Sequence, residues 1–143
     1  MKIYFLIYIL AVASGKTFTK CSLAQELVRD GVFRKDVHHW VCMAEHESGL
    51  ATSVVNVNAD GSANHGIFQI NDFWDCKPSN DRVSRNSCIQ PCSAFQDEDL
   101  KDDVICIKQK LQERHQGFVG ISYGYQQYCN GNVAPNYLNG CSY

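Results

Sequence analysis

The 143-residue sequence is marked first by what it lacks: after residue 15, no apolar run approaches the length of a membrane span. It has no run of basic residues, which argues against a nucleic-acid partner. Internal repeats, low-complexity segments and Asn-x-Ser/Thr glycosylation sites are also absent. We therefore expect one soluble domain with no membrane span and no repeat architecture.

The first 15 residues have the pattern of a secretory signal peptide. Lys2 supplies the positive charge, residues 3–13 form a short apolar run, and Ala13 and Gly15 are the small residues before the cleavage site. Cleavage after Gly15 leaves one domain, residues 16–143, with twelve basic and fifteen acidic residues and a net charge of −3. That negative charge weakens any electrostatic attraction to anionic bacterial surfaces.

All eight cysteines lie after the signal segment, which indicates an oxidising compartment and four disulfides. Each disulfide is worth about 2–4 kcal/mol, mainly because it restricts the unfolded chain. We therefore expect a secreted, extracellular protein. The spacing of the cysteines alone does not choose among the possible pairings.

Three segments place apolar residues on one helical face, at intervals of three and four. The first, around residues 23–28, stops at Gly31 and has Thr19 or Ser22 as its N-cap. The last runs from about residue 100 to residue 115. We expect these helices to supply most of the core.

The middle helix, residues 37–48, carries the most informative pattern, between a predicted N-cap at Asp36 and a stop at Gly49. Its apolar stripe consists of Val37, Trp40, Val41 and Ala44. The next position on that stripe is Glu47, whereas Trp40 is expected in the core. A carboxyl group on the buried side of a helix end indicates function, because burial favours its neutral form. The alternative is an ordinary solvated glutamate.

Residues 53–71 have strand rather than helix character. Val54, Val55 and Val57 favour a strand, residues 58–61 (NADG) are a turn signal, and residues 66–71 (GIFQIN) predict the returning strand. The cysteine-rich stretch of residues 72–95 is irregular. The fold class is therefore α+β, a helical lobe with a small antiparallel β lobe, and the join between the lobes favours a cleft.

Two motifs and the cysteine spacing carry a family resemblance. The cysteines are separated by 21, 34, 12, 4, 14, 23 and 12 residues, and the motifs are WVCMAEHES (residues 40–48) and NADGSANHGIFQIN (residues 58–71). Over essentially the whole mature chain, the sequence resembles the C-type lysozymes and α-lactalbumins, glycoside hydrolase family 22. The resemblance implies a lysozyme-like fold with the disulfides Cys21–Cys141, Cys42–Cys129, Cys76–Cys92 and Cys88–Cys106.

The resemblance also implies a chemistry: retaining hydrolysis of the β-1,4 bond between N-acetylmuramic acid and N-acetylglucosamine by two carboxyl groups, for which lysozyme is the type case. Glu47 matches the general acid. Asn64 stands where the family has the second, ionised aspartate, and Asp60 matches a structural aspartate that is not expected to replace it. Loss of a carboxylate next to the developing cation should cost about a thousandfold in rate.

Two further departures from the family pattern affect the cleft. Ser122 replaces a tryptophan that packs against the acid; its hydroxyl is expected to wet the pocket or hydrogen-bond the carboxylate and so weaken Glu47 as an acid, with Tyr123 or Tyr125 filling part of the space. Asp75 replaces the aromatic residue that precedes Cys76. The substrate-binding residues that the resemblance implies are Asn56, Asn58, Gln69, Asn71 and Trp74. Ordinary turn hydrogen bonding is the equal alternative for the polar members.

An acidic segment begins the last helix, with five acids in the seven residues 97–103. Favourable charge at a helix N-terminus explains one or two of them. The stretch resembles the calcium loop of α-lactalbumins and calcium-binding lysozymes. The resemblance implies carboxylate ligands from Asp97, Asp102 and Asp103 and backbone carbonyl ligands from Ala94 and Asp99. We expect this structural calcium and no cofactor for catalysis.

Three functions stay open from the sequence. Retention of Glu47 favours a weakened hydrolase of peptidoglycan. The three departures favour a catalytically inactive module that binds peptidoglycan, an N-acetylglucosamine-containing oligosaccharide or another partner. The third is a purely structural extracellular protein. A binding protein has no evident need for Glu47, so we favour the hydrolase. We also expect the protein to be a monomer.

Overall fold

The computed structural model describes residues 15–131 and 133–143, so nearly all of the predicted signal peptide lies outside the described residues. The helices are α1 (Lys20–Arg29), α2 (Val37–Ser48), α3 (Lys101–Arg114) and α4 (Tyr123–Tyr128). Short 3-10 helices are η1 (Arg34–Asp36), η2 (Cys92–Phe95) and η3 (Phe118–Gly120), and the strands are β1 (Val55–Val57), β2 (Ala63–His65) and β3 (Ile70–Asn71). Among the described residues, no helix has the length and apolarity to cross a membrane.

The helix ends follow local capping chemistry. Thr19 is the N-cap of α1, and it forms a reciprocal capping box with Ser22, so both predicted candidates take part. Helix α2 has the predicted bounds and ends at Gly49 in the left-handed conformation. Asp36 is the N-cap of α2, as predicted, but it also ends η1 and its side chain accepts no capping hydrogen bond.

The β lobe is a three-stranded antiparallel sheet in the order β1–β2–β3, not the two-stranded hairpin predicted from the sequence. Residues 66–69 form a tight turn between β2 and β3 instead of a strand. Gly66 has φ +78°, and a Cβ atom there would lie 1.6 Å from the carbonyl oxygen of Phe95. The prediction failed because the β-branched and aromatic residues of this segment favour a strand. The turn is required only because the backbone at Phe95 comes so close to Gly66.

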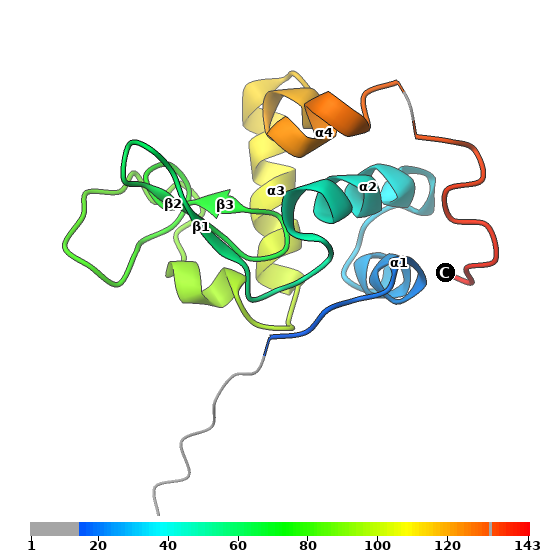
Figure 1. The fold of residues 1–143 in the computed structure, drawn as a ribbon, viewed down its shortest axis with the longest axis horizontal. Helices are drawn as coiled ribbons and strands as arrows, with labels where there is room; N and C mark the ends of the chain where they lie inside the picture. The colour runs from blue at the N-terminus through cyan, green and yellow to red at the C-terminus, as the bar shows by residue number, and fades with distance from the viewer. Residues whose placement is uncertain (1–14, 132) are drawn as a thin grey trace, which may run out of the picture.

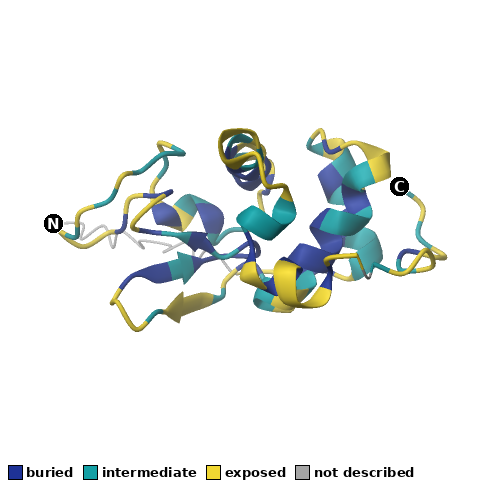
Figure 2. Cartoon of the chain, turned by 90° about the horizontal axis from the view of Figure 1, so that it is seen from above, coloured by how far each residue is buried: buried dark blue, intermediate teal, exposed yellow. Residues whose placement is uncertain are grey.

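The core lies mainly among the helices, and α3 runs beside the sheet as well as the helical lobe (Figure 1). Trp40 is buried on α2, as predicted, and its ring meets the rings of Phe68 and Phe118 edge-on. Phe95 of η2 is fully buried under the turn at Gly66. Burial of one such side chain contributes about 1.5–3 kcal/mol. Figure 2 shows the buried residues on the facing sides of the helices, whereas the outer strand β1 is exposed.

Four disulfides hold the segments that have little regular structure. They join Cys21–Cys141, Cys42–Cys129, Cys76–Cys92 and Cys88–Cys106, the pairs that the resemblance implies. The first two attach α4 and the C-terminal tail to α1 and α2. The other two fix the irregular stretch after β3 to η2 and α3, so the wall of the β lobe that faces the helices is held in place.

Candidate active site

Glu47 lies half-buried in the last turn of α2. The hydroxyl of the next residue, Ser48, donates to the carbonyl oxygens of Ala44 at 3.0 Å and Ile67 at 2.8 Å. The second of these bonds joins the end of α2 to the turn between β2 and β3. The helix end that carries Glu47 is therefore fixed against the β lobe.

Two groups at the start of α4 donate to the same oxygen of Glu47. Ser122 Oγ lies 2.5 Å from Glu47 Oε1, and the Gly124 backbone N–H donates to that atom at 3.1 Å. Ser122 Oγ also accepts the backbone N–H of Tyr125 at 3.0 Å, so it caps α4. No donor among the described residues reaches Glu47 Oε2, which leaves that oxygen available to hold a proton.

Ser122 therefore forms the predicted hydrogen bond, and the residue is only 5% exposed. The two tyrosines expected to fill space beside Glu47, Tyr123 and Tyr125, lie in different environments. Tyr123 is exposed at the rim of the cleft, whereas buried Tyr125 forms a 2.7 Å hydrogen bond with His39 Nδ1. Burial raises the pKa of Tyr125 and lowers the pKa of His39. Tyr125 thus packs against His39 and Phe118, and Tyr123 lies at the opening of the cleft.

Asn64 on β2 is held by two neighbouring amides. Its Oδ1 accepts from Asn71 Nδ2 at 2.8 Å and from Asn58 Nδ2 at 3.2 Å, and its own Nδ2 donates to Asn58 Oδ1 at 3.3 Å. Ser62 Oγ links to both of these neighbours. The side chain at this position is therefore held by hydrogen bonds to two residues, but it carries no charge.

Glu47 and Asn64 line one cavity of about 240 Å³ at the join of the two lobes. Of the five predicted substrate-binding residues, Gln69, Asn71 and Trp74 line it as well. Asn56 and Asn58 do not line it. Asn56 donates a hydrogen bond to Gln69, and Asn58 donates one to Asn64. The lining residues that sequence reasoning did not include among binding residues are Asp75, Lys110, Arg114, Ile121 and Tyr123.

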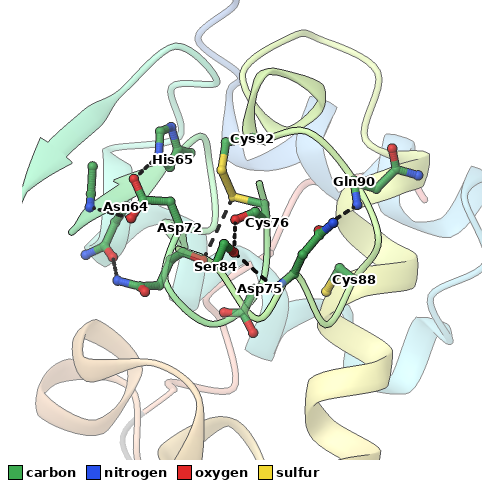
Figure 3. Close-up of a disulfide and its surroundings, with 12 residues drawn as sticks. Asn64, His65, Asp72, Asp75, Cys76, Ser84, Cys88, Gln90 and Cys92 are labelled. Carbon is green, nitrogen blue, oxygen red and sulfur yellow. Dashed lines mark hydrogen bonds and ion pairs between the residues drawn. A yellow bond between two sulfur atoms is a disulfide. The ribbon is translucent and has the colours of Figure 1, made fainter. Parts of the chain in front are cut away.

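Two charged residues of this lining form an ion pair between the lobes. Lys110 Nζ of α3 lies 2.5 Å from Asp75 Oδ2, with both side chains almost completely buried. Asp75 lies four residues after the end of β3, beside the Cys76–Cys92 disulfide (Figure 3). A signal existed in the sequence: Lys110 falls three residues after Ile107 on the apolar side of its helix.

A second polar cluster, His65, Asp72 and Gln96, joins segments of the β lobe. His65 of β2 is buried, with Nε2 3.2 Å from Asp72 Oδ2 and Nδ1 2.8 Å from Gln96 Nε2. Asp72 Oδ1 accepts the Ala63 backbone N–H at 3.0 Å. Figure 3 shows His65 and Asp72 facing each other beside Asn64. The cluster connects the strand that carries Asn64 to the start of the acidic segment.

Within the acidic segment, Asp103 is fully buried, and neither of its carboxylate oxygens has a hydrogen-bond partner among the described residues. Burial raises the pKa of Asp103 well above its ordinary value, and the nearby Asp97 and Asp102 add to the effect. Asp97 Oδ1 accepts from the backbone N–H of Asp99 at 3.1 Å. An orphaned buried carboxylate next to further acids fits an all-oxygen cation site.

Comparison with known proteins agrees with this architecture. A model of the C-type lysozyme/alpha-lactalbumin family matches residues 16–141. The chain belongs to this family. Lysozyme 1 of Musca domestica is 41% identical over 132 residues, which cover 92% of this chain and 89% of that protein. Lysozyme c-1 of Anopheles gambiae is 39% identical over 126 residues, which cover 88% and 86%.

Solved structures of family members share the fold. The apo-type structure of recombinant canine milk lysozyme superposes with a TM-score of 0.80 at 35% identity, over 90% of this chain and 100% of that chain. Lysozyme from Equus asinus gives 0.78 at 34% identity with the same coverage. The predicted α+β lysozyme fold is confirmed, and membership places the chain among glycoside hydrolases and their relatives.

Proposed function

We propose that this family member is a secreted, weak hydrolase of the β-1,4 bonds between N-acetylmuramic acid and N-acetylglucosamine in peptidoglycan. The observation that carries the proposal is Glu47: one oxygen is held by Ser122 and Gly124, and no donor among the described residues reaches the other. That arrangement orients a carboxyl group beside a cavity lined by polar groups. Secretion is supported by the four disulfides, which persist in oxidising compartments.

In this mechanism Glu47 is the general acid. A proton on Oε2 passes to the glycosidic oxygen as the bond to the anomeric carbon breaks, and the positive charge develops on the sugar. Asn64 faces that charge only with the dipole of its amide, because an amide cannot ionise or form the covalent ester. A water molecule then adds to the cation and passes a proton to the Glu47 carboxylate, which restores the acid. The slow step reflects the missing carboxylate.

Clearing of a bacterial cell-wall suspension tests the proposal. The purified mature protein should clear it slowly between about pH 4 and pH 8, and Glu47→Gln, which keeps the shape but cannot donate the proton, should abolish clearing. His46→Gln on the adjacent, exposed position is the matched control and should stay active. If the wild type cleared cell walls no faster than Glu47→Gln at every pH, the proposal that the protein is a hydrolase would be refuted.

A second candidate is a module that binds the saccharide without cutting it. Asn64 in place of the carboxylate and the Ser122 hydrogen bond to Glu47 favour it. Isothermal titration separates the two functions. Binding of an N-acetylglucosamine oligomer that survives in Glu47→Gln, together with no turnover by the wild type, would support the module.

We also propose that Asp97, Asp102 and Asp103, with the carbonyls of Ala94 and Asp99, hold a structural calcium ion. The orphaned carboxylate of Asp103 supports it. A ligand that binds only the folded state stabilises by about 2.7 kcal/mol at a hundred times its Kd.

Calcium added to metal-free protein should therefore raise Tm, on the order of 10 °C. Asp103→Asn should abolish that shift. The matched control is Glu98→Gln, which removes an exposed acid of the same segment and should retain the shift. An unchanged Tm in the wild type would refute the site.

A further inference from the structure

The cleft contains a buried ion pair that the proposed acid chemistry of Glu47 does not use. Lys110 and Asp75 have side chains only 8% and 4% exposed, and their charged atoms are 2.5 Å apart. Ser87 Oγ donates to the other oxygen of Asp75, Oδ1, at 3.2 Å. Both oxygens of the Asp75 carboxylate are thus occupied, so the acid is satisfied by the protein itself.

The ammonium group of Lys110 is not satisfied in the same way. It has three N–H donors, and Asp75 is its only acceptor among the described residues. Lys110 also lines the cavity with Glu47 and Asn64. Buried donors without acceptors are costly. The remaining donors are therefore suited to an acceptor that enters the cleft.

Arg114 adds a second cation to the same wall. It lies one helical turn after Lys110 on α3 and lines the same cavity, and no carboxylate of the described residues lies within ion-pair distance of it. Its hydrogen bond to the Gly120 carbonyl oxygen, at 3.4 Å, is long.

The charge of the cleft follows from these residues. Asp75 neutralises Lys110, Asn64 contributes no charge, and Glu47 is neutral when it carries the proton to be donated. In that state Arg114 leaves the wall with a net positive charge. A negative substituent on the bound sugar would gain from this wall, whereas a neutral sugar would not.

We propose that Lys110 and Arg114, with Asp75 positioning Lys110, bind a carboxylate of the saccharide, so that the cleft selects acidic over neutral oligosaccharides. The inference rests on the proposed function only in that the cleft binds saccharide, not in that it cuts one. Two sources supply the same chemistry: the lactyl carboxylate of a muramic acid residue and the ring carboxylate of a uronic acid residue.

Isothermal titration of the mature protein with three tetrasaccharides tests this selection. The probes are neutral chitotetraose, an alternating N-acetylglucosamine–N-acetylmuramic acid oligomer and an alternating N-acetylglucosamine–glucuronic acid oligomer. At least one acidic probe should bind about tenfold more tightly than chitotetraose, equivalent to about 1.4 kcal/mol. The preference should shrink as salt screens the charges. Whichever acidic probe binds better identifies the source of the carboxylate.

Variants assign the preference to the residues. Arg114→Gln should reduce the preference, and Lys110→Met should abolish it. Because Lys110→Met leaves Asp75 as an uncompensated buried charge and lowers stability, the double variant Asp75→Asn/Lys110→Met is measured too and should keep only the smaller preference that Arg114 supplies. Lys110→Arg should keep the preference. Lys108→Met is the matched control, since Lys108 lies on α3 outside this cavity and donates to the Gly31 carbonyl.

Equal affinity of the wild type for all three probes, or no binding of any of them, would overturn the inference. An equal loss of preference in Lys108→Met and the double variant would also overturn it. The outcome is independent of turnover. A cleft that selects acidic saccharides without cutting cell walls would leave this inference standing and contradict the hydrolase.

Discussion

The helical wall and the β wall of the cleft differ in the functional group that each carries. On the helical wall Glu47 remains, but a serine and a backbone amide now donate to its Oε1. On the β wall the amides of Asn58 and Asn71 hold Asn64, which we propose stands in place of the catalytic carboxylate. The comparison shows that the orientation of a catalytic position and its charge are separable, because the sheet supplies the first and one side chain supplies the second.

The largest expected effect comes from returning the charge to the β wall. Asn64→Asp should raise kcat for peptidoglycan hydrolysis by about a thousandfold, because a carboxylate near the developing cation is worth roughly 4 kcal/mol. The amides that would hold it already point at the site. Asn56→Asp, which adds the same charge on the exposed strand β1, is the control and should leave kcat within a few-fold. A rate for Asn64→Asp no higher than the wild type would show that the β wall no longer orients its side chain.

A second prediction concerns that orientation. In the Asn64→Asp background, Asn71→Ala should lower kcat by about tenfold, since the lost hydrogen bond is to a charged group and contributes about 1.5–3 kcal/mol. In the wild-type background the same substitution should change kcat much less. Steady-state kinetics of the four proteins give the coupling between the two positions, and a coupling of zero would separate Asn71 from the catalytic position.

On the helical wall, Ser122→Ala should lower stability, because the hydroxyl caps α4 as well as contacting Glu47. Loss of an N-cap costs about 0.5–2 kcal/mol, which corresponds to a Tm decrease of roughly 2–8 °C. Thr19→Ala removes the cap of α1, far from the cleft, and should lower Tm similarly. Only Ser122→Ala should also change the rate of cell-wall clearing; the same change in both variants would mean that the rate merely follows stability.

The smallest expected effect lies behind the helical wall. Burial, with a contribution from His38, lowers the pKa of His39, so the folded state binds this proton less readily than the unfolded state does. The contribution of His39 to stability is therefore present above the unfolded value of about 6.5 and is lost as pH falls through the window below it. Thermal melts between pH 7.5 and pH 5.5 should show a shallower decline for His39→Gln than for the wild type. If Tm fell equally with pH in both proteins, His39 would not contribute to the pH dependence of stability.

Sequence patterns predicted the parts of the site that local periodicity determines. Glu47 follows from the apolar stripe of α2, whereas Ser122 came from the family resemblance and not from periodicity. The turn at Gly66 was missed because its requirement comes from the carbonyl of Phe95, 29 positions away and invisible to a local pattern. Local rules predict an element from its own residues, whereas a close backbone approach depends on another segment.

The charged wall was missed for a related reason. Asp75 was recognised as a departure from the family pattern and Lys110 was not, although the two form a single feature. A charge on the apolar side of a helix indicates a partner, but 35 residues separate these two positions. The fold brings them together through the disulfides that fix the loop after β3 to η2 and α3.

The most direct test of the central claim, that Glu47 cuts the bond and Asn64 limits the rate, is hydrolysis of one defined peptidoglycan tetrasaccharide by four proteins measured together. These are the wild type, Asn64→Asp, Glu47→Gln and the double variant. We predict that Asn64→Asp is fastest, that the wild type is slow but measurable, and that both proteins with Glu47→Gln are inactive. A wild type indistinguishable from Glu47→Gln would contradict the claim and leave the cleft as a binding site.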